Sequence, residues 1–394
     1  MFEKIPVMVI RKMPEVLTWT TGEGVLRHIY ESYVEELSRA LGQLMSRLVH
    51  LGHDTTELQK QLDSSSDTVF LRVLTAPETS YRLTYSDSCT PGEAADSIQH
   101  SLQAEMAREG RSTELKYDVW TPYGDMCFRS DGSVFQFPQM SAAIPLDFGS
   151  PLVAKVDLGG PGNSIAELRA PFDTSEMKLI IERLNLTCQG IHSVWPPLLD
   201  FVLTFNKVLI FVKDPAAPNQ FSSGSTTQYV GRTFITNPHV DSVNIADLAE
   251  ALVHEGIHAL LFMDELLHPW GDIPELRDGV RRVGSPWTGN SLSLSSFLQA
   301  CFVWYGLAHF WALALREHDF DSQRIKQRFI QAVSGFLSGP LVNNLETFLP
   351  GIYPDVIDTI QEMQARIVNA FAGNQIQSRE PLTEVQASSE IWPS

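Results

Sequence analysis

The sequence predicts a predominantly helical α+β protein in which one buried helix lies beside a small antiparallel sheet. Three observations lead to this prediction. Long segments with apolar residues at steps of three and four dominate both ends of the chain. Short segments rich in β-branched and aromatic residues occupy its middle. Hydrophobic residues make up 43% and charged residues 19%, a composition typical of globular rather than disordered chains.

The first half predicts three helices followed by a hairpin. Apolar residues at helical spacing predict a helix over about 22–51. A polar turn and a Pro-interrupted helix are expected in 64–83, and a further helix in 96–108. The segment 109–175 is rich in Gly, Pro, Ser and Asp, which predicts loops and short strands, with a hairpin over 127–137 around Asp131 and Gly132.

The second half predicts a strand, an extended segment and four long helices. A helix is expected over 178–186, a strand over 207–212 and extended chain over 221–237. Asn244 is placed to cap the helix 245–267, and Asp247 lies in its first turn. That helix is apolar nearly all round, which predicts burial. Further helices are predicted over 293–317, 321–337 and 355–371.

The domain organisation follows from these elements. We expect a helical N-terminal region over 1–130, a metal-binding catalytic region over 131–375 and a polar tail over 376–394, with a single continuous domain as the alternative.

Composition excludes several classes of function. The net charge of −18 argues against nucleic acid as a partner, because binding phosphate requires a basic surface. The four cysteines form no CxxC pair, so neither a zinc knuckle nor a disulfide framework is indicated. We expect no signal peptide and no membrane partner, and therefore a cytoplasmic protein. The sequence does not specify an oligomeric state.

Residues 254–258, His-Glu-Gly-Ile-His, form the strongest chemical motif. His254 and His258 are four residues apart, so on a helix they lie one above the other, about 6 Å apart. Both imidazoles can then bind one metal ion, while Glu255 provides a carboxylate beside a metal-bound water. The motif also arises by chance in chains that bind no metal. The buried helix and the cost of burying Glu255 without a partner favour metal binding here.

A third ligand does not follow from the motif. The residues after His258 lack the Gly and His of the longer metzincin motif, and the Glu expected of thermolysin-like peptidases is missing from the next helix. Gln299 is one remaining donor, although a buried amide bonded to backbone is an alternative. His309 is another, although in an apolar helix a core histidine is at least as common as a ligand.

A second stretch, 284–311, resembles a known family when it is taken together with the HExxH helix. Ser285-Pro286-Trp287 follows the motif by about thirty residues, and the run Gln299–Gly306 follows in a long helix. The segments 70–83 and 144–151 are also similar to those of the family. The chain thus resembles the HExxH-type, 2-oxoglutarate- and Fe(II)-dependent peptide β-hydroxylases of bacterial natural-product clusters, as a divergent member. The resemblance would cover about residues 20–370, and it implies a zincin-like HExxH helix.

The resemblance also implies a site. His254, His258 and a third donor would bind Fe(II), and an arginine would bind a carboxylate of 2-oxoglutarate. This sequence has Gln299 where the family's third histidine is expected, and Thr288–Ser291 where its arginine is expected. Arg281 and Arg282 are the nearest replacement, although such a pair commonly lies on a surface. Ser285, Trp287 and Arg232 are the candidate substrate-pocket residues, with a core position as the alternative for Trp287.

Three hypotheses remain open. The first is a non-haem Fe(II) oxygenase that modifies a peptide or amino-acid-derived substrate. The second is a zinc metallopeptidase in which Glu255 is the general base and an edge strand near 228–236 holds the substrate. The third is a non-catalytic homologue that binds a peptide or a partner protein.

Overall fold

The structure is a computed structural model that describes residues 9–20, 22–85, 89–111, 117–141, 143–150, 170–278, 281–316 and 320–377. Its internal contacts divide the chain into two compact units. Unit 1 comprises 1–29, 187–201 and 260–394, and unit 2 comprises 30–186 and 202–259. The predicted boundary near residue 130 falls inside unit 2. Four helices pass from one unit to the other: α2 (Glu23–His50), α8 (Thr174–Val194), α9 (Pro196–Phe205) and α10 (Ile245–Leu267).

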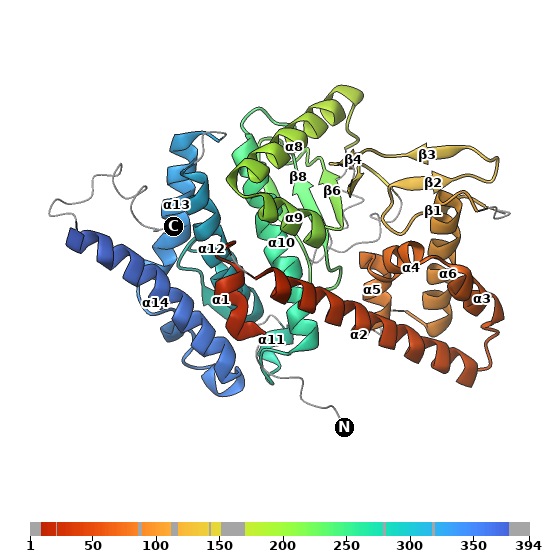
Figure 1. Ribbon diagram of the computed structural model, residues 1–394, viewed down its shortest axis with the longest axis horizontal. Helices are drawn as coiled ribbons and strands as arrows, with labels where there is room; N and C mark the ends of the chain where they lie inside the picture. Colours follow the sequence, from red (N-terminus) through yellow and green to blue (C-terminus); the bar gives the residue numbers. More distant parts are fainter. Residues whose placement is uncertain are drawn as a thin grey trace. The chain divides into compact units, whose positions relative to one another are not determined.

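Unit 1 is built mainly from helices. Its other described elements are η1 (Ile10–Lys12), α1 (Met13–Val16), α11 (Glu275–Asp278), β9 (Arg282–Gly284), β10 (Ser291–Ser293), α12 (Leu294–Ala314), α13 (Ser322–Leu337), η3 (Leu341–Leu345), η4 (Leu349–Gly351) and α14 (Pro354–Gln377). Helix α12 packs against α13, which packs in turn against α14 (Figure 1). Strands β9 and β10 form an antiparallel hairpin directly before α12.

Unit 2 combines short helices with two sheets. Its other described elements are α3 (Thr56–Ser64), α4 (Asp67–Leu74), α5 (Pro77–Thr84), α6 (Pro91–Arg108), β1 (Val119–Trp120), β2 (Met126–Phe128), β3 (Val134–Gln136), β4 (Gln139–Met140), β5 (Ile144–Asp147), β6 (Val208–Val212), β7 (Ser222–Gly224) and β8 (Arg232–Thr236). Strands β1, β2 and β3 form an antiparallel sheet beside α6 (Figure 1). The hairpin expected around Asp131 is the β2–β3 pair.

The predicted class, a predominantly helical α+β fold, is confirmed, since helices account for 60% of the structure. The sheet of unit 2 that includes β6 and β8 is mixed rather than wholly antiparallel. Its strand order is β4-β5-β6-β8-β7, in which β5, β6 and β8 run parallel and both outer pairs run antiparallel. The parallel pairing of β5 with β6 is possible because α8 and α9 lie between them in the chain and provide the long crossover that it needs.

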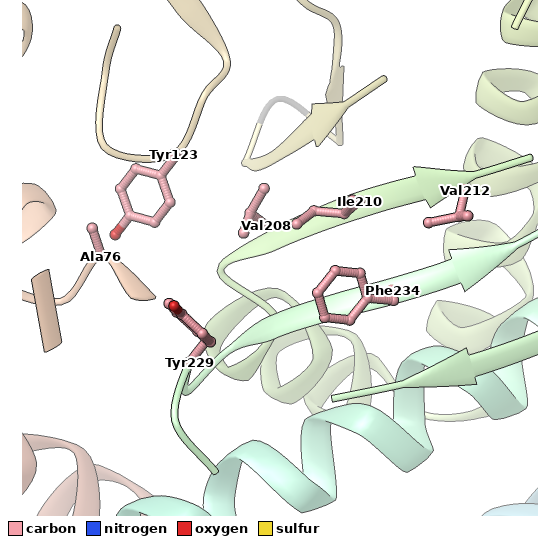
Figure 2. Packing of buried hydrophobic residues seen from close by; sticks show 7 residues of the cluster. All are labelled: Ala76, Tyr123, Val208, Ile210, Val212, Tyr229 and Phe234. Atoms are coloured by element: carbon pink, nitrogen blue, oxygen red, sulfur yellow. The ribbon is translucent and has the colours of Figure 1, made fainter. Parts of the chain in front are cut away.

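One face of this sheet is covered by an apolar cluster. Side chains of Val208, Ile210 and Val212 project from β6, and Phe234 lies beside them on β8 (Figure 2). Ala76, Tyr123 and Tyr229 complete the cluster. Alternate residues of a strand share a face, so this face carries the even-numbered residues of β6 and β8.

The opposite face of the sheet is tied to α10 by a buried amide. Asn206 accepts a hydrogen bond from the Thr233 hydroxyl at 2.7 Å and donates to the backbone oxygen of Leu252 in α10 at 3.1 Å. It also donates to the carbonyl of Val202 at 3.0 Å. Asn206 is 1% exposed. This side chain therefore fixes the N-terminal half of α10 against β8.

The predicted bounds of α10 are confirmed. Asn244 and Asp247 exchange hydrogen bonds between side chain and backbone, at 3.0 and 3.2 Å, which caps the first turn. Other helices are longer than predicted: α6 begins at Pro91, behind a capping box formed by Thr90 and Glu93, and α8 extends over 174–194. Helix α14 continues to Gln377, and the remainder of the predicted tail lies outside the described residues.

One described helix, α12, is long and apolar enough to cross a membrane. Because 89% of its apolar window is buried inside the protein, it is weak evidence for a membrane span.

We predict that Asn206→Ala lowers the free energy of unfolding by about 2–4 kcal/mol, because it leaves the Thr233 hydroxyl and the Leu252 carbonyl buried without their partner. Urea denaturation measures the change. Asn344→Ala, at an exposed position, is the matched control and should shift stability by less than about 0.5 kcal/mol. Equal effects of the two substitutions would contradict the role of Asn206.

Candidate functional site

The two histidines of the HExxH motif lie side by side on α10. The centroids of the His254 and His258 rings are 4.9 Å apart, with their planes inclined by 58°. Both side chains are partly buried on a helix that is otherwise almost wholly buried. Burial lowers the pKa of His254 to about 4; the neighbouring His258 lowers it further, while Glu255 opposes the shift. His254 is therefore neutral at physiological pH, the protonation state in which imidazole binds metals.

Glu255 points toward the edge of the sheet and is held there by two serines. The hydroxyl of Ser223, on β7, donates to Oε1 at 2.7 Å. The hydroxyl of Ser225, directly after β7, donates to Oε2, also at 2.7 Å. Glu255 is 2% exposed, whereas the two serines are partly buried. The carboxylate thus has one hydroxyl partner on each oxygen.

The charge of Glu255 has no cationic counterpart of its own. Among the described residues, the one basic group within ion-pair distance is His254, whose Nε2 lies 4.0 Å from Oε1. Because burial keeps His254 neutral, this contact provides no positive charge. Burying a carboxylate beside neutral groups alone costs several kcal/mol. A cation bound by the histidines would offset that cost.

The donors present fit part of a metal site. Two imidazoles one helical turn apart suit Zn²⁺ or Fe(II). In the described part of the chain, however, no group of three or more His, Cys, Asp or Glu side chains is arranged to hold a metal ion. Within the described residues, a metal at His254 and His258 would therefore need further ligands of another donor type, from water or from substrate.

Gln299, the expected third ligand, lies on α12 in unit 1. It is 3% exposed, and its amide nitrogen donates to Oε2 of Glu265 at 3.0 Å. Burial raises the pKa of Glu265, while the bond from Gln299 opposes that shift. The nearby Asp264 is fully buried and lies within hydrogen-bond distance of Trp270 Nε1 (3.2 Å) and His268 Nδ1 (3.3 Å). Gln299 thus belongs to a polar cluster at the C-terminal end of α10.

The Ser-Pro-Trp stretch has a packing role in unit 1. The indole nitrogen of Trp287 donates to the carbonyl of Ala332 at 2.9 Å, and its ring stacks on Trp304 with centroids 6.0 Å apart. A Cβ at Gly335 would lie 2.4 Å from this ring, so α13 can approach only because residue 335 is glycine. Ser285 is buried, and its hydroxyl accepts from the backbone of Thr288 at 3.3 Å. These contacts match the core alternative for Trp287.

The candidate arginines lie in different surroundings. Arg281 and Arg282 are exposed at β9; Nε of Arg281 is 3.7 Å from Glu275, and Arg282 donates to the carbonyl of Ser291 at 2.6 Å. Arg232 is 3% exposed at the start of β8, where it pairs with Glu78 and its guanidinium covers the ring of Tyr229 at 4.2 Å.

Arg232 projects from the sheet face opposite Thr233, because neighbouring strand residues point to opposite faces. It therefore lies on the side away from α10. The expected edge strand near 228–236 also differs from the structure: β8 pairs on both sides, and β7 is the edge.

His309, the alternative ligand, is a buried histidine of unit 1. It lies on α12 in edge contact with Tyr305, at 4.6 Å between ring centroids. Burial lowers its pKa to about 3, and the charge of Arg366 lowers it further. These surroundings match the core-histidine alternative.

Sequence reasoning missed Ser223 and Ser225. They lie about thirty residues before Glu255, in a segment identified only as extended chain. The Ser-x-Ser spacing places both hydroxyls on one side of such a segment, which is the one local sign of a shared partner.

No protein-family model matches this chain, and a comparison with curated proteins gives no match. The chemistry of the site is therefore inferred from its residues.

We predict that Trp287→Ala lowers the free energy of unfolding by about 3–5 kcal/mol, because it removes a buried indole and its hydrogen bond. Thermal or urea unfolding measures the loss. Trp195→Ala, at a site 36% exposed, is the control and should cost far less. If Trp287→Ala lowered the free energy of unfolding no more than Trp195→Ala, Trp287 would line an open pocket instead of the core.

We predict a pH effect from His309. Its folded pKa is about 3 against 6.5 for the free group, so its contribution to stability is complete above pH 6.5 and is lost as the pH falls toward 3. When the pH falls from 7 to 5, the free energy of unfolding should decrease by about 2 kcal/mol less in His309→Phe than in the unaltered chain. Urea unfolding at both pH values measures this difference. His50→Phe, at an exposed site, serves as control, and an unchanged acid dependence in His309→Phe would contradict the assignment.

Proposed function

We propose that the protein is a metal-dependent oxygenase, with Fe(II) as the metal and 2-oxoglutarate as co-substrate, that hydroxylates a peptide or amino-acid-derived substrate. We place its activity in the cytoplasm. His254 and His258 would hold the metal. Gln299 as a third ligand, and Arg281 and Arg282 as groups that bind the co-substrate's carboxylate, stay predictions from the sequence.

The buried charge of Glu255 is the observation that carries the proposal of a metal. Its carboxylate is 2% exposed, its hydrogen-bond donors Ser223 and Ser225 are neutral hydroxyls, and the adjacent His254 is itself neutral. A divalent cation at the two histidines would lie close enough to the carboxylate to compensate its charge in a region of low dielectric constant. The same residues without a cation would carry the desolvation cost uncompensated.

The direction of Glu255 favours an oxygenase over a peptidase. A general base must lie within hydrogen-bond reach of the proton it removes. Both oxygens of Glu255 instead accept bonds from Ser223 and Ser225, toward β7. A hydroxylase places no such demand on this carboxylate, which can act as a fixed negative charge beside the metal.

The sheet edge supports a peptide as the substrate. Among the described strands, β7 pairs with β8 alone and ends the strand order of its sheet. Its outer side can therefore accept backbone hydrogen bonds from an extended chain, as edge strands do in peptide recognition. Ser223 and Ser225 hold Glu255 at this edge. A peptide bound there would therefore lie next to Glu255, which directly follows His254 in the chain.

The proposed net reaction consumes one C–H bond of the substrate, one O₂ and one 2-oxoglutarate. It yields the hydroxylated substrate, succinate and CO₂, so that one oxygen atom enters the C–OH bond and the other enters succinate. Bound Fe(II) would supply the activation of oxygen. The chain's own contribution would be two imidazole ligands and a buried carboxylate held by Ser223 and Ser225.

A zinc metallopeptidase is the second candidate. It is favoured by the combination of the HExxH helix and an edge strand next to it, both of which such enzymes use. In that case Glu255 would have to release its serine partners to act as the base.

We predict that the anaerobic Fe(II)-loaded protein develops a visible charge-transfer band when 2-oxoglutarate is added, and that His254→Ala abolishes both the metal and the band. His268→Ala is the matched control, because His268 directly follows the same helix but contacts Asp264. Metal analysis and absorption spectroscopy measure the two results. Bound zinc without a band would overturn the oxygenase proposal.

We predict that Glu255→Gln keeps most of the turnover of the oxygenase, measured as succinate formed, because glutamine can keep hydrogen bonds to both serines. In a peptidase the same substitution removes the base and should lower peptide cleavage by about 10²- to 10⁴-fold. Loss of activity on that scale would favour the second candidate.

A further inference from the structure

We infer that Ser223 and Ser225, here called the serine pair, are positioning residues that hold Glu255 as a fixed counter-charge beside the metal bound by His254 and His258. The inference rests on the metal-binding part of the proposed function. It assigns a role in the outer coordination sphere to two residues of the edge strand, and it does not depend on which reaction the metal performs.

The geometry explains why two serines can share one carboxylate. Residues two apart in extended chain point to the same side, so the hydroxyls of Ser223, on β7, and Ser225, directly after it, point in one direction. Each meets a different oxygen of Glu255 at 2.7 Å. Ser222 pairs with Thr236 and is exposed, and its side chain points to the other side of the strand. Ser222 is also a serine, so the serine pair differs from it only in the direction in which the side chains point.

The position of Glu255 is coupled to that of the histidines. Consecutive residues of an α-helix are rotated by about 100° around its axis. A rotation of α10 that moved Glu255 away from β7 would move His254 and His258 by the same angle. Because the serine pair fixes the direction of Glu255, it also fixes the direction in which the histidine pair faces.

The serine pair also sets the distance between the buried charge and the metal. Oε1 of Glu255 lies 4.0 Å from Nε2 of His254. At that separation the carboxylate attracts a cation bound at the imidazole, while its two hydroxyl bonds keep it from turning away. Groups that orient ligands or charges in this way commonly change metal affinity by about 10- to 100-fold when removed.

The test is a Co(II) titration of the full chain, followed by absorption spectroscopy. Ser223→Ala/Ser225→Ala should weaken Co(II) binding by about 10- to 100-fold. Ser222→Ala, the matched control on the same strand, should leave the affinity unchanged. Ser223→Thr keeps the hydroxyl on a residue that strands favour, and it should retain affinity within about threefold.

The possible results of this titration distinguish the role of the serine pair from the existence of the metal site. If the unaltered chain binds Co(II) and the double variant binds it as tightly as Ser222→Ala, the role of the serine pair is overturned while the metal site stands. If the unaltered chain binds no Co(II), both fall. If the double variant does not fold, as judged by circular dichroism, Ser225→Ala decides. Ser225 lies outside the strand ladder, and Ser225→Ala should lower the affinity for Co(II) at least fivefold. An unchanged affinity for Co(II) in this variant would overturn the inference.

Discussion

The burial of one carboxylate is the constraint on which the site depends. Glu255 lies within a helix that is apolar on most of its surface, and it cannot be exposed without turning α10 out of the core. Its charge is met by two neutral hydroxyls and by an imidazole that burial keeps neutral. A cation held by the histidine pair would resolve this imbalance, which is why we propose that this costly helix binds a metal.

Within unit 2, two sets of hydrogen bonds hold that helix against the sheet. Asn206 links Thr233 of β8 to the backbone of α10, and the serine pair links β7 to Glu255. Apolar side chains cover the other face of the sheet (Figure 2). The sheet therefore supports α10, and β7, the edge strand proposed to bind an extended substrate, also carries a serine that orients Glu255.

Local sequence patterns predicted the helix of the site well, because its ends are set by local interactions. Asn244 and Asp247 cap the start of α10, and the helix ends before His268 and Pro269. The serine pair could not be found in this way, since its partner lies about thirty residues away and only the folded chain brings them together. The edge strand expected near 228–236 could not be placed correctly for the same reason, because β7 pairs on the outer side of β8. The Ser-Pro-Trp stretch shows the reverse case, in which a stretch singled out for function is explained by the packing of Trp287 against α13.

The most direct test of the central claim is X-ray absorption spectroscopy of the Fe(II)-loaded protein, which reports the ligands at the metal. We expect the scattering of two imidazole groups, a remainder of oxygen ligands, and no change in the number of oxygen ligands when Glu255 is replaced by glutamine. A spectrum without imidazole scattering, or the loss of one oxygen ligand in Glu255→Gln, would contradict the account of a histidine-bound metal with Glu255 as its fixed counter-charge.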